Sequence, residues 1–363
     1  MTLKSISACF FTALAFTSAI AIARDAGVFA VTTVNSSDSV APPPTTRHST
    51  LNAKANSKWH PKLIRTIQGF TQMVGAIAIT PDGQNIVAGN DSGAIKVWNL
   101  KTGKLVRSLN GHTDSVLSLA ISPNGKTLVS ASGLNEQAVK IWDLKTGAVI
   151  KTIQKPDWFV KSVAISPDNK QLALGIWNTA TSKPQVEVLN LSTGATIYSL
   201  QGSSQSNLTV QFSPNGKILA SGNEDSTIQL WDLATGNLIH TLNHGAGVRA
   251  IAFSRDSKSL ISESYTQTVK VWNVQTGELI STPVADSGIV FVNAVAVHPQ
   301  GDVFASALGG ENGVLNIFDL ATGKVISPVT GYSGVVSALA FTPNGQNLVS
   351  GNSDGSISIW QGK

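Results

Sequence analysis

One repeat unit recurs seven times between residue 62 and the end of this 363-residue chain, and it limits the possible folds more than any other feature. A turn phrase such as TPDGQ, SPNGK or SPDNK occurs in each unit, and a phrase such as KTG, STG or ATG occurs in six of them. These phrases form tight turns, and the runs between them, such as AIKVWNL and TIQLWDL, alternate apolar with polar residues. Each unit therefore predicts four short antiparallel strands and no substantial helix.

A tryptophan near the end of the third predicted strand keeps the units in register, and it recurs about 44 residues apart on average. It is present, or replaced by Leu or Phe, at Trp98, Trp142, Leu189, Trp231, Trp272, Phe318 and Trp360. With its Trp-Asp pairs and a Gly-His pair at 111–112, the segment 62–363 resembles the WD-repeat family, in particular secreted bacterial members. The resemblance implies an all-β protein, namely a single seven-bladed β-propeller with four-stranded antiparallel blades.

The first copy of one phrase has no unit in front of it. Residues 62–69 (KLIRTIQG) match residues 104–111 (KLVRSLNG), which end a unit, whereas the seventh unit ends with its third strand. In the WD-repeat family the sequence repeat is offset from the blade. The resemblance therefore implies that 62–69 is the outermost strand of the last blade, paired with 356–360. This pairing would close the ring and cover an otherwise exposed sheet edge.

The segment before the repeats carries other signals. An apolar stretch over 6–23 follows a single charge, Lys4, and ends in the triplet AIA, which fits a cleavage site. We expect a signal peptide over 1–23 and export to the periplasm or the extracellular space, with no membrane span left after cleavage. An uncleaved membrane anchor is the alternative. Residues 24–61, rich in Ser, Thr, Asn and Pro, predict a disordered linker before the propeller domain, 62–363.

Composition argues against several function classes. The 26 Lys and Arg residues exceed the 21 Asp and Glu residues, but they are scattered, whereas nucleic-acid-binding proteins gather them into a stripe. Cys9 is the only cysteine and lies in the predicted signal peptide, so no thiol remains for a disulfide, a metal or a nucleophile. The histidines lack metal-ligand spacing, and no phosphate-binding loop or nucleophile elbow occurs. We predict a monomeric propeller without enzyme activity, cofactor or metal.

Several conspicuous side chains are assigned to the fold. In the WD-repeat family the third-strand aromatic residues pack between blades, often with a hydrogen-bond chain of His, Ser or Thr, Asp and Trp. Here that chain looks incomplete in every unit, and the second unit offers Glu136 near the Asp position. The residues given a structural role are Trp98, Trp142, Trp231, Trp272, Phe318, Trp360, His112, Asp225 and Asp354.

The candidates for function lie in loops on one rim. WD-repeat domains mostly bind proteins through the loops before each innermost strand and between the two middle strands, and the resemblance implies the same here. Large side chains at these loops are Met73, Trp158, Phe159, Trp177, Phe291, Tyr332 and Val335, with Trp177 opening a long loop, NTATSKPQ. Because aromatic anchors dominate interface energetics, we expect a non-catalytic scaffold that binds an unidentified protein or peptide.

Three alternatives stay open. Phe159 and Phe291 fit packing between blades as well as exposure. The rings of Trp158 and Trp177 suit stacking on a glycan or a cell-wall polymer as well as binding a protein. An enzyme with a site at the central channel is the third alternative, although no His, Glu and Asp set converges there from several units.

Overall fold

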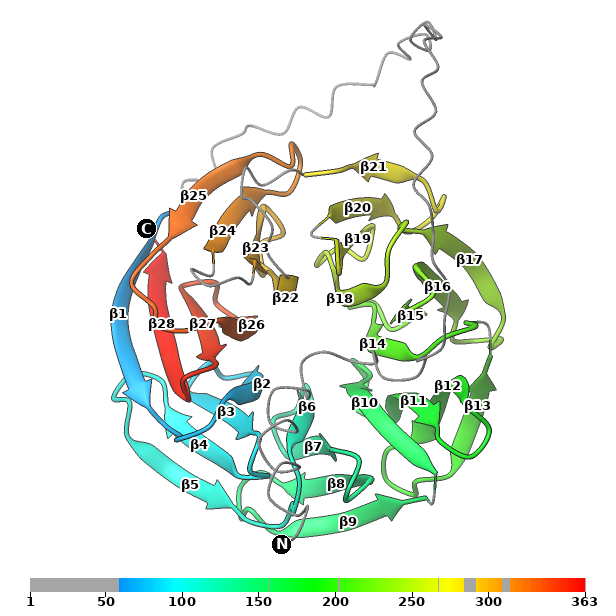
Figure 1. Cartoon of the computed structure of the whole chain (residues 1–363), viewed down its shortest axis with the longest axis horizontal. Helices are drawn as coiled ribbons and strands as arrows, with labels where there is room; N and C mark the ends of the chain where they lie inside the picture. The colour runs from blue at the N-terminus through cyan, green and yellow to red at the C-terminus, as the bar shows by residue number, and fades with distance from the viewer. Residues whose placement is uncertain are drawn as a thin grey trace, which may run out of the picture. The chain divides into compact units, whose positions relative to one another are not determined.

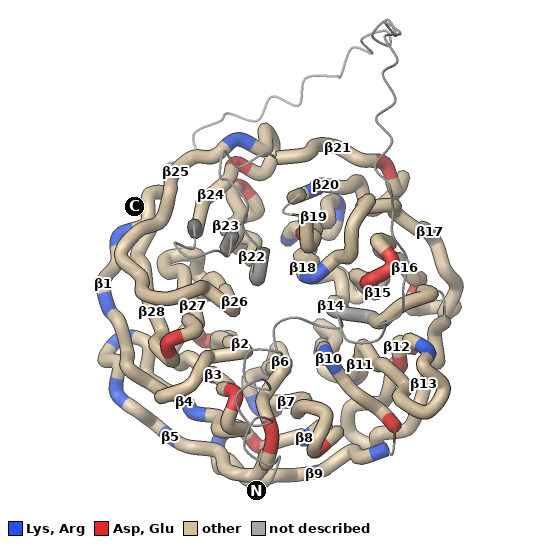
Figure 2. The backbone as a smooth tube through the Cα atoms, viewed as in Figure 1, with Lys and Arg blue, Asp and Glu red and all other residues tan. Residues whose placement is uncertain are grey.

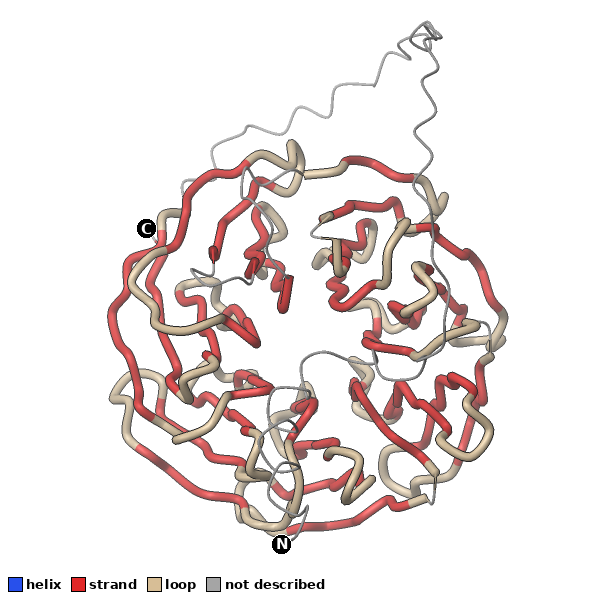
Figure 3. Tube along the Cα trace, viewed as in Figure 1, coloured by secondary structure: helices blue, strands red, loops and turns tan. Residues whose placement is uncertain are grey.

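The structure is a computed structural model that describes residues 59–155, 157–201, 203–266, 268–283, 292–308 and 314–362. Over these residues the backbone forms 28 strands in seven four-stranded sheets and no helix (Figure 3). Each sheet is one blade of a ring, and every strand pairs antiparallel with its neighbours (Figure 1). The predicted seven-bladed propeller is therefore confirmed. Within the same ranges, no helix has the length and apolar character of a membrane span.

The blades are numbered in chain order, and their strands are given from the innermost outwards. Blades 1 to 3 comprise β2 (Val74–Ile79), β3 (Asn85–Asn90), β4 (Ile95–Asn99) and β5 (Leu105–Leu109); β6 (Val116–Ile121), β7 (Thr127–Ser132), β8 (Ala138–Asp143) and β9 (Val149–Gln154); and β10 (Trp158–Ile165), β11 (Gln171–Asn178), β12 (Lys183–Asn190) and β13 (Thr196–Leu200). Blades 4 to 6 comprise β14 (Asn207–Phe212), β15 (Ile218–Asn223), β16 (Thr227–Asp232) and β17 (Leu238–Asn243); β18 (Val248–Phe253), β19 (Ser259–Ser264), β20 (Val269–Asn273) and β21 (Leu279–Ser281); and β22 (Val292–Val297), β23 (Val303–Leu308), β24 (Val314–Asp319) and β25 (Val325–Val329). Blade 7 comprises β26 (Val336–Phe341), β27 (Asn347–Asn352), β28 (Ser356–Gly362) and β1 (Pro61–Gln68).

The ring is closed by strands from opposite ends of the repeat region. Strand β1 pairs antiparallel with β28, with Lys62 opposite Gln361 and Gln68 opposite Ser356. This confirms the predicted closure, which gives the third strand of blade 7 a hydrogen-bonded neighbour. The N-terminal strand of the repeat region thus completes the sheet of the last blade, and the chain then continues into β2 of the first blade.

The described structure of blade 7 begins before residue 62, inside the range expected to be a linker. Trp59 is buried, its indole Nε1 donates to the Gly345 carbonyl oxygen at 3.1 Å, and its ring meets Phe341 edge-on at 5.1 Å between centroids. The contact holds the start of β1 against the turn before β27. The predicted signal peptide and the rest of the predicted linker lie outside the described residues.

The third strand of each blade presents a large apolar side chain to the preceding blade. Trp142 on β8 packs with Val87 and Ile95 of blade 1. Trp98 on β4 packs with Val349 of blade 7. At most 4% of each side chain at this position is exposed, at Trp98, Trp142, Leu189, Trp231, Trp272, Phe318 and Trp360. Truncating such a buried aromatic residue costs about 3–5 kcal/mol, so this packing is a main source of ring stability.

Candidate functional site

The candidate site lies on one face of the ring, which we call the rim. It consists of the loops that lead into the innermost strands and the loops between the second and third strands. The two kinds of loop lie side by side, because the Asp91 amide donates to the Met73 carbonyl at 3.1 Å in blade 1. Ser353 and Val335 make the same contact in blade 7 at 2.8 Å. The turns between the first and second strands lie at the opposite ends of the strands.

Blade 3 differs from the other blades at the rim. Its three inner strands have eight residues each, whereas those of the other blades have five to seven. The additional pairs place Phe159 opposite Trp177 and Trp158 opposite Asn178. Residues 178–185, expected to be a loop, are partly strand, and only 179–182 form the connection. The longer hairpin thus places three aromatic residues at the rim end of blade 3. Phe159 and Trp177 share one face of the sheet, and Trp158 lies on the other, towards blade 2.

The three aromatic side chains of blade 3 are half-buried. Trp158 packs partly against the core shared by blades 2 and 3, and the Lys155 ammonium lies 3.9 Å from its ring centre. Lys161 Nζ lies 5.8 Å from the centre of the Phe159 ring. A cation over an aromatic face is attracted by the ring quadrupole. The site is therefore a mixed aromatic and cationic surface whose rings are fixed in place by the blade.

Leu134 adds an apolar side chain that the sequence analysis missed. It lies in the loop between β7 and β8 of blade 2, and 54% of its surface is exposed. The other large apolar side chains that are this exposed lie on outermost strands, away from the rim. The extra length of the GLNEQ loop was the available signal. We define the blade 3 patch as Leu134, Trp158, Phe159 and Trp177 with Lys155.

The remaining predicted rim residues belong to other blades. Met73 and Val335 are half-buried in blades 1 and 7. Tyr332 is also half-buried and meets Trp360 edge-on at 6.0 Å, and burial raises the pKa of its phenol. Phe291 lies outside the described residues. The structure thus places three of the seven predicted rim residues on blade 3, and it brings two of them, Phe159 and Trp177, to opposite positions on paired strands.

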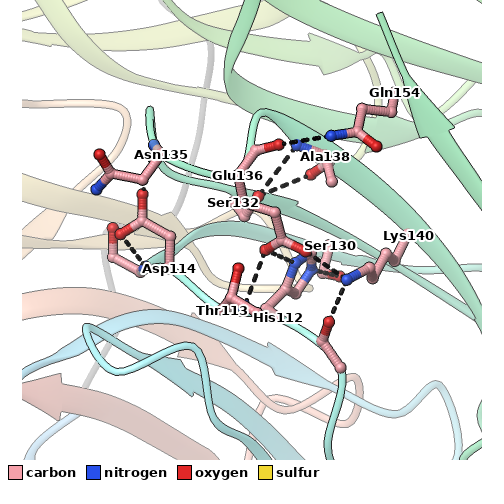
Figure 4. A network of polar contacts seen from close by, with 12 residues as sticks. His112, Thr113, Asp114, Ser130, Ser132, Asn135, Glu136, Ala138, Lys140 and Gln154 are labelled. Atoms are coloured by element: carbon pink, nitrogen blue, oxygen red, sulfur yellow. Dashed lines mark hydrogen bonds and ion pairs between the residues drawn. The ribbon is translucent and has the colours of Figure 1, made fainter.

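A polar network fixes the rim loops of blade 2 (Figure 4). His112 Nδ1 donates to the Glu136 carboxylate at 2.7 Å, and the Ser130 hydroxyl donates to His112 Nε2 at 2.6 Å. Ser130 Oγ accepts from Trp142 Nε1 at 2.8 Å. The expectation that this chain is incomplete in every unit is wrong for blade 2, because the longer Glu136 side chain reaches the place of Asp. Lys140 bonds the same carboxylate.

The network also determines protonation. Burial lowers the pKa of His112 more than the neighbouring carboxylate raises it, so the imidazole is neutral. Hydrogen bonds from Lys140 and His112 outweigh burial and lower the pKa of Glu136. A neutral imidazole between a carboxylate and a hydroxyl relays hydrogen bonds from the loop to the core. The network has a structural role and offers no free nucleophile or metal ligand.

The structure gives Asp225 and Asp354 comparable roles in blades 4 and 7. Asp225 accepts from the Ser204 amide at 2.7 Å and from the Thr227 hydroxyl at 2.5 Å. Asp354 accepts from the hydroxyls of Ser333 and Ser356 at 2.5 Å and 2.6 Å. These bonds lower the pKa of both carboxyls despite partial burial. Each aspartate thus ties together the two rim loops of its blade.

The central channel lacks the features of an enzyme site among its described lining residues. It has a volume of about 490 Å³ and is bordered by the innermost strands of all seven blades. The innermost strands carry two charged positions, Lys161 on β10 and Arg249 on β18 (Figure 2). Among the described residues, no group of three His, Cys, Asp or Glu side chains could hold a metal ion.

Comparisons with known proteins point to one repeat family. A family model described as "NWD2 C-terminal beta-propeller" matches residues 65–246, which is half of the chain. A second, described as "WD domain, G-beta repeat", matches residues 236–273 and 323–361. Together these matches extend from the closing strand of the ring to its last blade.

Curated relatives match over shorter stretches. Serine-threonine kinase receptor-associated protein of Dictyostelium discoideum is 34% identical over 71 residues, which cover 20% of this chain and 24% of that protein. Pre-mRNA-processing factor 19 of Oryza sativa subsp. japonica is 35% identical over 66 residues, 18% of this chain and 12% of that protein. The human serine-threonine kinase receptor-associated protein is 24% identical over 138 residues, 38% of each chain. The chain thus spans less than half the length of each relative.

Proposed function

Because the chain belongs to the WD-repeat β-propeller family, we propose that it is a non-catalytic scaffold that binds a protein or peptide at the blade 3 patch. The observation that carries the proposal is the longer hairpin of blade 3, which places Phe159 and Trp177 opposite each other at the rim, with Trp158 on the other face of the same sheet. Folding alone does not require these extra strand pairs, since the other blades close without them.

The chemistry of the patch fits a peptide or protein surface. Interface hot spots typically consist of a few aromatic side chains held in place, surrounded by contacts that contribute little to the binding free energy. Exposed Leu134 and the rings of blade 3 offer apolar area, and Lys155 offers a charge at its edge. Such a patch suits a segment that presents an apolar side chain next to an acidic one.

Glycan binding is the second candidate, and the position of Lys155 disfavours it. Stacking on a sugar needs an open ring face, whereas the Lys155 ammonium lies 3.9 Å from the centre of the Trp158 ring. An enzyme site is supported less, because the innermost strands that border the channel carry no His, Asp or Glu residue.

The test uses the full chain as bait on an extract of the source cells. The variant Leu134→Ser/Trp177→Ala removes two of the large apolar side chains of the patch. The matched control, Ile150→Ser, removes an equally exposed apolar side chain from β9, outside the rim. We expect wild type and the control to retain the same partner and the patch variant to lose it at unchanged melting temperature. Retention by all three baits contradicts the site, and release by free sugars favours the glycan alternative.

Export is proposed as well, on the strength of the apolar stretch over residues 6–23. The chain expressed in its source organism would then be found outside the cytoplasm and begin near Arg24. Cell fractionation with sequencing of the mature N-terminus tests this. A cytoplasmic protein that still begins at Met1 contradicts it.

A further inference from the structure

One position of the second strand brings neighbouring blades into close contact. At Gly89 an added Cβ would lie 2.5 Å from the Val116 side chain of the next blade, and at Gly351 it would lie 2.5 Å from Val74. Real Cβ atoms do not approach this closely, so the position favours the smallest residues. Six blades have Gly or Ala there, at Gly89, Ala131, Gly175, Gly222, Ala307 and Gly351. The seventh, blade 5, has Glu263.

Glu263 is fully buried where blade 5 meets blade 6. Among the described residues, neither carboxyl oxygen has a hydrogen-bond partner. Ala250 on β18 and Val269 on β20 lie opposite it in the sheet. The charged and titratable groups near it are Arg249 on β18 and Tyr265 after β19, and the Arg249 guanidinium lies 5.0 Å from the Tyr265 ring centre. Across the junction, β23 contributes the Ser306 hydroxyl.

The polar chain at this junction is also incomplete. In blades 2 and 5 a third-strand indole donates to a second-strand serine at 2.8 Å, from Trp142 to Ser130 and from Trp272 to Ser262. Blade 6 has Phe318 in the indole position, stacked on Phe304 at 4.8 Å between centroids. Phenylalanine has no N–H, and the buried Ser306 hydroxyl has no hydrogen-bond partner among the described residues.

The outer circumference of the ring shows the same weakness. In five of the seven blades an outermost strand donates a side-chain hydrogen bond to a turn carbonyl of the next blade, an arrangement we call the clasp. These blades have it through Arg65, Arg107, Lys151, Tyr198 and His240. Blade 6 has Ser327 at this position, and its hydroxyl donates to Pro328 of the same strand instead. The corresponding residue of blade 5 is Ser281, at the end of the three-residue strand β21. Its buried hydroxyl has no partner among the described residues, so the junction lacks a clasp.

We propose that the junction between blades 5 and 6, which we call the seam, is a proton-controlled weak point of the ring. The seam is closed while Glu263 carries its proton, and it loosens when the carboxyl ionises. A neutral acid tolerates a closely packed interface, whereas an ionised carboxylate there has lost its water, and the Ser306 hydroxyl and the Arg249 guanidinium do not compensate for that loss.

The direction of the pH effect follows from burial. Desolvation raises the pKa of Glu263 well above its ordinary value of 4.5, against the opposing effects of Ser306 and Arg249. The closed seam therefore holds a proton that the opened chain releases. The stabilisation of the closed seam by this proton is complete below about pH 4.5, and it is lost as the pH rises through the raised pKa of Glu263. Buried His112 and His244 act in the opposite direction, because their pKa values are lowered.

The test compares the full chain with Glu263→Gln and Glu263→Ala between pH 5 and pH 9. Glutamine keeps the shape without a charge, and alanine is the residue that blades 2 and 6 have at this position. Glu187→Gln, in β12 of blade 3, is the matched control, since it also removes a buried carboxyl. We expect both Glu263 variants to melt at least about 2 °C above wild type at pH 8, and this gain to shrink towards pH 5.

Hydrogen exchange locates the effect. After correction for intrinsic rates, raising the pH from 5 to 8 should reduce protection in β19 and β23 of wild type and of Glu187→Gln, but not in Glu263→Gln. Parallel pH profiles of wild type and both Glu263 variants would overturn the proposal. Loss of protection spread evenly over all blades would overturn it too.

Discussion

Blades 2 and 6 follow the same four-strand plan, but they treat their buried polar groups differently. In blade 2, Ser130 accepts from the Trp142 indole and bonds His112, which in turn bonds Glu136. In blade 6 the equivalent Ser306 has no hydrogen-bond partner among the described residues and faces a buried carboxyl across the seam. A buried polar group without a hydrogen-bond partner lowers the stability of the fold by about 1–3 kcal/mol. Blades with the same strand order can therefore form junctions of unequal strength.

The largest effect is expected from removing the strand that closes the ring, because all blades, including blades 2 and 6, depend on that closure. Deleting residues 59–69 removes β1 and the Trp59 contact, leaving β28 an open edge. We expect loss of the cooperative melting transition and aggregation, because an unpaired edge strand recruits other chains. Calorimetry and size-exclusion chromatography measure this. Deleting 24–58 is the control and should leave the melting temperature unchanged; a Δ59–69 chain that melts like wild type refutes the closure role.

The next effect concerns acid and blade 5. Burial lowers the pKa of His244 to about 4 from 6.5, so the folded state favours the neutral imidazole. Its stabilisation is present above pH 6.5 and falls by up to about 3 kcal/mol as the pH drops to 4. In urea unfolding, His244→Gln should reduce this loss of unfolding free energy between pH 6.5 and pH 4. The control His60→Gln, at an exposed histidine, should show the same loss as wild type. An equal loss of stability at acid pH in wild type and His244→Gln would show that the His244 imidazole does not contribute to the pH dependence.

A matched pair of serines tests the comparison directly. Ser130→Ala leaves the Trp142 indole N–H and His112 Nε2 without a partner and should cost about 1–3 kcal/mol. Ser306→Ala removes a buried hydroxyl that has no partner among the described residues, so it should not lower stability and should raise it by up to about 1–3 kcal/mol. Urea unfolding of both variants at one pH gives the two values. Equal losses would mean that the two blades are not different in the way described.

The smallest expected effects come from exchanging the clasp. Arg107 donates to the Leu144 carbonyl at 3.0 Å at the junction of blades 1 and 2, and Ser281 stands at the same position of the seam. Arg107→Ser should lose about 0.5–1 kcal/mol, and Ser281→Arg should gain a similar amount if the new guanidinium reaches the next turn. Melting temperatures of the two variants and of the double exchange check this. A lower melting temperature in both single variants would show that the clasp does not stabilise the junctions.

Much of the fold could be predicted because each unit repeats its turn chemistry. The turn phrases locate the strand ends. The match between 62–69 and 104–111, together with the resemblance to the WD-repeat family, predicts the closing strand that the structure confirms. Repetition makes the assignment of strands and turns more certain, since all seven copies must fit the same strand pattern. The third-strand position was visible for the same reason, including its replacement by Leu189 and Phe318.

The site was less predictable because it depends on departures from the repeat. The NTATSKPQ segment was read as a loop, and only the structure shows that the flanking strands extend into it. Glu136 was read as a mismatch because its reach depends on loop conformation, including a positive φ of 51° at Gln137. Glu263 carried a signal that was overlooked: aligning the second strands sets it against six small residues.

Native-state hydrogen exchange of the wild-type chain at pH 8, in increasing urea below the unfolding transition, tests the central claim most directly. The account predicts that amides of β19 and β23 at the seam exchange through an opening of lower free energy than those of β3 and β7 in blades 1 and 2. If all blades open with one common free energy, or if blades 1 and 2 separate first, then the unequal treatment of buried polar groups does not set the strength of the ring.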